Sequence, residues 1–162
     1  MKACLIIALF AVGVLCLVTA ENQEFTKDGL VITFHSEKLN RTAAAQVCAE
    51  EGGTLGKIPN KAIQDFIFEK AKELKAARFI KSSSLWFGYD CTDERKAIWS
   101  DGEDVDYKHC AKWSCYTKCR TGANKWMFSV VPCKYKTWLN AGEWFRAWIG
   151  NTASFICTHD EE

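Results

Sequence analysis

The chain lacks a second long hydrophobic run, a Cys-x-x-Cys pair, and any acidic residue between Tyr107 and Gly142. Without a second run, the sequence predicts no membrane span beyond its N-terminal segment. Without Cys-x-x-Cys, a thioredoxin type of redox site is excluded. The acid-free stretch lacks the carboxylates that a calcium site requires. Because no nucleophile and base can be paired from the sequence, we do not expect an enzyme.

The apolar N-terminus predicts a secreted, extracellular protein. Lys2 precedes a run of about 16 apolar residues, and the small residues Val18 and Ala20 occupy the positions expected before a cleavage site. We therefore expect a signal peptide over residues 1–20 and one mature domain over residues 21–162, which is long enough for a real hydrophobic core. A membrane anchor is the competing interpretation of the same run.

Seven of the nine cysteines belong to the mature domain, because Cys4 and Cys16 lie in the signal segment. An oxidising compartment favours disulfides, and an odd number leaves at least one thiol free or bridged to another chain. Three cysteines crowd into the segment "HCAKWSCYTKC" beside His109. Zinc is the weaker interpretation of this segment, because a second pair of ligands is missing. We expect its cysteines to staple a loop.

The charge is unevenly distributed, although the mature chain has 20 basic residues (21 less Lys2) against 20 acidic ones. Residues 90–106 contain seven acids, whereas residues 108–142 contain seven basic side chains and six aromatic ones. Such a basic aromatic segment is a candidate surface for an anionic ligand, although Trp126 especially fits a core position as well. With Arg146 from further along the chain, the candidate ligand-binding residues are Lys112, Trp113, Tyr116, Lys118, Arg120, Lys125, Trp126 and Arg146.

The hydrophobic patterns predict a strand, two helices and then several short strands. The alternating segment "GLVITFHS" indicates the first strand. The segment "NRTAAAQVCAEEGG" indicates a helix capped by Asn40 or Thr42, and apolar residues at helical spacing after Asn60 indicate a second helix that ends before "KSSS". From Leu85 onward, aromatic and β-branched runs separated by turn residues predict short strands.

Several motifs resemble the C-type lectin-like domain in order and spacing, from about Val31 to Cys157. They are "CAEEGGTLGKIPN", "LWFGYD", "IWSDG", Cys133, Trp144 and "SFIC". The resemblance implies an α+β fold with two helices packed on small antiparallel sheets and a long loop, which is stapled here. It also implies a disulfide between Cys48 and Cys157, and core positions for Trp86 and Trp99.

This sequence departs from the family at the positions that hold calcium in its sugar-binding members. The Glu-Pro-Asn or Gln-Pro-Asp tripeptide is missing, Val131-Pro132 precedes Cys133, and Trp144-Phe145-Arg146 stands in place of Trp-Asn-Asp. Calcium needs about six to eight oxygen ligands, so we predict neither a metal nor another cofactor at the usual sugar site.

The inner disulfide of the family also lacks a partner, because Ile149 occupies the position eight residues before Cys157. Five cysteines outside the Cys48–Cys157 pair allow about 15 arrangements with two bridges. Our preferred arrangement joins Cys91 to Cys110 and Cys133 to Cys115 or Cys119.

These features predict a secreted, non-catalytic recognition protein that binds a glycan, an anionic one included, or another extracellular partner without calcium. The resemblance implies a defence lectin of innate immunity or a structural protein. The alternative is a disulfide-linked interaction or toxin-like subunit, in which an unpaired cysteine joins two chains. We expect no nucleic-acid partner and no membrane span after cleavage. Asn40 begins a glycosylation sequon, Asn40-Arg41-Thr42.

Overall fold

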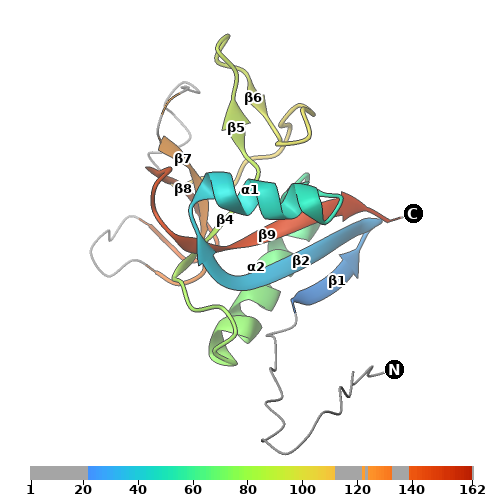
Figure 1. Ribbon diagram of the computed structural model, residues 1–162, viewed down its shortest axis with the longest axis vertical. Helices are drawn as coiled ribbons and strands as arrows, with labels where there is room; N and C mark the ends of the chain where they lie inside the picture. The colour runs from blue at the N-terminus through green and yellow to red at the C-terminus, as the bar shows by residue number, and fades with distance from the viewer. Residues whose placement is uncertain (1–21, 112–121, 123, 133–138, 162) are drawn as a thin grey trace, which may run out of the picture.

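The computed structural model describes residues 22–111, 122, 124–132 and 139–161. Within these residues the expected order of a strand, two helices and short strands is confirmed, with the α+β class (Figure 1). Neither helix has the length and apolar character that a membrane span needs. The segment predicted to be a signal peptide lies outside the described residues. The elements are β1 (Gln23–Lys27), β2 (Leu30–Leu39), α1 (Arg41–Glu50), β3 (Thr54–Leu55), α2 (Lys61–Ala76), β4 (Ser84–Trp86), β5 (Asp90–Cys91), β6 (Ala97–Ile98), β7 (Asn124–Ser129), β8 (Trp144–Trp148) and β9 (Ala153–Asp160).

Seven strands form one sheet in the order β1-β2-β9-β4-β7-β8, with β3 paired to β9. Strands β5 and β6 form a separate hairpin that projects from the body of the molecule (Figure 1). The sheet is not antiparallel throughout as expected, because β9 pairs antiparallel with β2 on one side and parallel with β4 on the other. The last strand thus enters the middle of the sheet, between elements that are distant in the sequence.

The sheet begins with a hairpin that the sequence patterns did not predict. Strand β1 pairs with β2 so that Lys27 faces Leu30 across a two-residue loop. The loop residues Asp28 and Gly29 have φ angles of 52° and 76°. Positive φ at both positions defines a type I′ turn, whose twist matches that of the two strands.

Both helices begin at an asparagine that caps them. The Asn40 side chain accepts a hydrogen bond from the Ala43 amide at 3.0 Å, and Asn60 does the same for the Ile63 amide at 2.9 Å. Each cap satisfies an amide that has no partner inside the helix. The two predicted helix starts are therefore confirmed.

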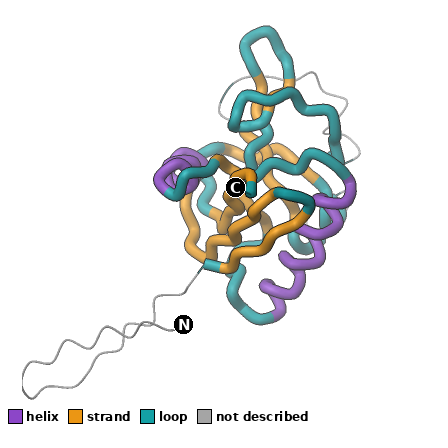
Figure 2. Tube along the Cα trace, turned by 90° about the vertical axis from the view of Figure 1, so that its right-hand side faces the viewer, coloured by secondary structure: helices purple, strands orange, loops and turns teal. Residues whose placement is uncertain are grey.

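The helices cover opposite faces of the sheet, with the strands between them (Figure 2). On one face α2 contributes Ile63, Ile67 and Ala71 to the larger core, which also contains Trp99. On the other face Ala44 and Cys48 of α1 pack with Trp86 in a smaller core. Trp86 and Trp99 are buried, as predicted.

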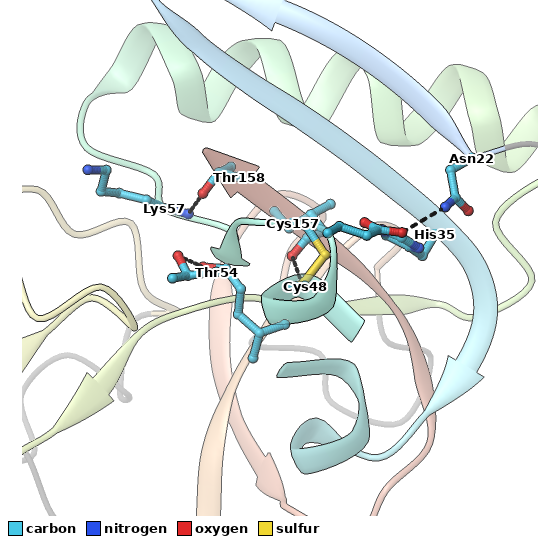
Figure 3. Close-up of a disulfide and its surroundings, with 10 residues drawn as sticks. Asn22, His35, Cys48, Thr54, Lys57, Cys157 and Thr158 are labelled. Atoms are coloured by element: carbon cyan, nitrogen blue, oxygen red, sulfur yellow. Dashed lines mark hydrogen bonds and ion pairs between the residues drawn. A yellow bond between two sulfur atoms is a disulfide. The ribbon is translucent and has the colours of Figure 1, made fainter. Parts of the chain in front are cut away.

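The disulfide between Cys48 and Cys157 is confirmed, and it joins α1 to β9 across a sequence separation of 109 residues (Figure 3). Cys91 and Cys110 also belong to disulfides. The preferred pairing of Cys91 with Cys110 stays a prediction. Cys115, Cys119 and Cys133 lie outside the described residues.

The β7–β8 hairpin places position 149 at its open end. Asn124 lies opposite Trp148, and Phe128 lies opposite Trp144. Ile149, which follows β8, therefore lies near the start of β7. Because Cys133 lies outside the described residues, its bridge to Cys115 or Cys119 stays a prediction.

Candidate functional site

Three of the eight predicted contact residues fall within the described part of the chain, and all three lie on the β7–β8 hairpin. Lys125 and Trp126 belong to β7, and Arg146 belongs to β8 directly opposite Trp126. The other five lie outside the described residues and stay predictions: Lys112, Trp113, Tyr116, Lys118 and Arg120.

The hairpin sends these three side chains to two different faces of the sheet. Trp126 is buried in the larger core, where its ring lies 4.9 Å from the ring of Tyr89. Trp126 is therefore a core residue, which was the alternative interpretation of its place in the sequence. Lys125 points to the other face, as alternation along a strand requires. Arg146 is half-buried and, among the described residues, has no ion pair.

Lys125 belongs to a partly buried ion-pair network that links α1, β5 and β7. Its Nζ lies 2.6 Å from Asp90 Oδ1, and Arg41 Nη2 lies 3.3 Å from Asp90 Oδ2. Burial lowers the pKa of the Arg41 guanidinium, and the negative charge of Asp90 opposes that effect. The sequence segment around Lys125 is free of acids, but the fold brings it a carboxylate from a strand 35 residues earlier.

The positions that hold calcium in sugar-binding relatives of this fold do not fit the ion here. Trp144 is fully buried, with its ring 5.0 Å from Phe87, and its Nε1 donates to Gln64 Oε1 at 2.9 Å. Phe145 packs against the smaller core and Arg146 is cationic. These side chains supply no oxygen ligand. The Asp90 carboxylate already binds Lys125 and Arg41, so it is not available to complete a site.

A second polar group lies beside the Cys48–Cys157 disulfide (Figure 3). His35 is 1% exposed, stacks on Phe155 with ring centroids 4.3 Å apart, and places Nε2 3.1 Å from Glu51 Oε2. Burial lowers the pKa of His35, although Glu51 acts in the opposite direction. The Cys157 sulfur lies near both groups, but as half of a disulfide it is not a thiolate and does not complete a metal site.

The sequence patterns missed one exposed residue on the same hairpin. Trp148 is the last residue of β8. It is 59% exposed and is the large hydrophobic residue on the surface of the part of the chain that the structure describes. Trp144, Arg146 and Trp148 share one face of β8. Their exposure increases along the strand, from fully buried through half-buried to exposed. The alternation in "WFRAW" contained this signal, because residues two apart on a strand share a face.

Comparison with known proteins identifies the family. The profile of the lectin C-type domain matches residues 37–141, which is more than half of the chain. The protein belongs to the C-type lectin domain family. Enzymes are not typical of this family, and no enzymatic activity is indicated.

This C-type lectin domain resembles the galactose-specific lectin nattectin of Thalassophryne nattereri, with 31% identity over 77 residues. That match covers 47% of this chain and 46% of nattectin, so it spans less than half of either protein.

The fold is shared with two solved structures. The carbohydrate-recognition domain of cow CD23, studied with GlcNAc2Man3 oligosaccharide, superposes with a TM-score of 0.65 at 19% identity, over 86% of this chain and 94% of that one. A calcium-independent type II antifreeze protein gives a TM-score of 0.61 at 15% identity, over 85% and 91%.

Proposed function

We propose that this C-type lectin domain is a secreted recognition protein that binds glycans without calcium. The binding residues would come from the exposed end of β8 and from the basic sequence segment 112–120, which lies outside the described residues. Membership of the family and the similarity to a galactose-specific lectin support a carbohydrate ligand. The apolar N-terminus supports secretion through a cleaved signal peptide.

One observation carries the calcium-independent part of the proposal. After Trp144, the two positions Phe145 and Arg146 place an aromatic ring and a cation where calcium-binding relatives have the oxygen ligands of Asn and Asp. A cation at that place repels a divalent ion. The similarity in fold to a calcium-independent antifreeze protein is consistent with a fold of this type that needs no ion for its function.

A glycan array with the full mature chain tests the proposal directly. The protein is applied once in buffer with calcium and once with a chelator, and bound protein is detected through a C-terminal tag. We expect the same glycans to be bound under both conditions. Loss of all binding in the chelator would show that calcium is required, and absence of binding to every glycan would remove the carbohydrate function.

A disulfide-linked dimer is the alternative assembly, because seven cysteines in the mature chain are an odd number. Electrophoresis and light scattering with and without reductant measure it. A protein that stays monomeric without reductant would contradict the dimer. Glycan recognition by a single chain would then be the remaining proposal.

A further inference from the structure

Trp148 is held in a defined position although it is exposed. Its six-membered ring lies over Gly150, where a Cβ atom would come within 2.2 Å of Trp148 Cζ3. Any side chain at position 150 would therefore displace the indole. Glycine at this position lets the ring pack against the backbone, while 59% of the residue remains open to solvent.

The turn that carries this ring is anchored to buried parts of the molecule. The Asn151 amide donates to the Trp148 carbonyl at 3.0 Å, which closes the turn. The Asn151 carbonyl accepts a hydrogen bond from Nε1 of the buried Trp86 at 3.2 Å. The carbonyl of Ile149 accepts from the first amide of α1, that of Arg41, at 3.4 Å. An aromatic ring on such a turn loses little conformational entropy when it binds a ligand.

Arg146 lies two residues before Trp148 on the same face of β8, at a spacing of about 6.7 Å along the strand. No carboxylate among the described residues pairs with it. The Asp90 carboxylate lies on the opposite face of the hairpin, where Lys125 and Arg41 bind it. In the part of the chain that the structure describes, a positive charge therefore stands beside the exposed ring without a compensating acid.

From this pairing we infer that Trp148 and Arg146 form a binding subsite for an acidic sugar, one that carries a carboxylate or a sulfate. The inference rests on the proposed glycan-binding function and names the class of glycan. The apolar C–H face of a pyranose ring packs on the indole. The guanidinium forms charge-assisted, bidentate hydrogen bonds with the anionic substituent. An apolar ligand would leave the Arg146 charge without a partner, and a neutral sugar would use the ring alone.

Titration calorimetry in chelator tests the subsite with three probes: a sulfated galactose oligosaccharide, an oligosaccharide of the same length that contains uronic acid, and the desulfated form of the first. We expect both acidic probes to bind at least about tenfold more tightly than the desulfated form, as a charge-assisted pair implies. Equal affinity for all three probes, or equal binding of an acidic peptide, would overturn the assignment to acidic sugars.

Variants separate the roles of the two side chains. We expect Trp148→Ala and Gly150→Ala each to weaken binding of all three probes several-fold, and Trp148→Phe to retain most of the affinity. Arg146→Gln should abolish the preference for acidic probes and leave the affinity for the desulfated form unchanged. Arg78→Gln is the matched control, because Arg78 is an exposed cation that follows α2, and it should bind like the unaltered protein.

The outcomes distinguish this inference from the function on which it rests. If the unaltered protein binds glycans and the Trp148 and Arg146 variants bind equally well, the subsite is wrong and glycan recognition stands. If the unaltered protein binds no glycan, the function itself fails. The midpoint of urea unfolding, measured for every variant, shows that each one is folded; because Trp148 is mostly exposed, its replacement should shift the midpoint little.

Discussion

Replacing Asp90 by asparagine should destabilise the fold more than the loss of an ordinary surface ion pair. The Asp90 carboxylate binds two cations, and the exposed fractions of the three side chains are 10% for Arg41, 18% for Lys125 and 24% for Asp90. The Asp90→Asn variant would keep the size of the side chain and leave both cations partly buried without a counter-charge.

The expected loss of unfolding free energy lies between two known limits. An exposed ion pair contributes about 0–1 kcal/mol, whereas removing one partner of a fully buried pair costs roughly 3–5 kcal/mol. Because the network is mostly but not fully buried and asparagine retains one hydrogen-bond acceptor, we expect a loss of roughly 2–4 kcal/mol in the free energy of unfolding. For a chain of this size that corresponds to a decrease in Tm of about 5–15 °C.

Urea unfolding at neutral pH, followed by tryptophan fluorescence, measures the effect. Asp104→Asn is the matched control, since its ion pair with Lys96 leaves both side chains 58% exposed, and it should cost less than about 1 kcal/mol. Adding Lys125→Met to Asp90→Asn should recover part of the loss, because one of the two unpaired cations is then removed. Equal, small losses in Asp90→Asn and Asp104→Asn would refute the reasoning.

Three further predictions concern the disulfide, His35 and the sequon. The double variant Cys48→Ala/Cys157→Ala should lose about 4 kcal/mol of unfolding free energy, because the bond closes a loop of 109 residues; urea unfolding that matches the unaltered protein would contradict this. Because burial lowers the pKa of His35 in the folded protein, as the pH falls below about 6.5 this histidine is protonated in the unfolded chain before it is protonated in the folded one. The free energy of unfolding should therefore be constant above pH 7.5 and fall toward pH 5 by up to about 1.4 kcal/mol per pH unit; His35→Gln should flatten that dependence and His159→Gln, at an exposed position, should keep it. Asn40 is exposed and caps α1 through its oxygen, which leaves its nitrogen available, so protein secreted from eukaryotic cells should lose mass on treatment with an N-glycosidase while Asn40→Asp should show no such change.

The elements governed by local rules could be predicted from the sequence. Asn40 and Asn60 mark the helix starts because capping depends on residues three positions apart. Strand β1 was missed, although the Asp28-Gly29 pair is a strong signal for a hairpin between two strands. The Cys48–Cys157 bond was found through the resemblance to a family, and not through spacing.

The features that depend on distant residues could not be predicted. Asp90 pairs with Lys125, which follows it by 35 residues, and with Arg41, which precedes the second helix in the sequence. From the sequence alone, the positive charge of Lys125 therefore seemed to have no nearby acid. The prediction that Lys125, Trp126 and Arg146 bind a ligand rested on charge and aromatic content alone. The register decides which of those side chains reach solvent, because a shift by one residue would exchange the two faces.

The position of β9 next to β2 has a practical consequence for attaching this protein to a surface or a scaffold. The last described residue, Glu161, bonds to the turn at Gly29, on the side of the molecule away from β7 and β8 (Figure 1). Strand β8 forms the opposite margin of the sheet. A tether at the C-terminus would therefore present Trp148 outward. If the proposed subsite binds as inferred, several copies on one support would bind a multivalent target together, and avidity would add to the affinity of each single contact.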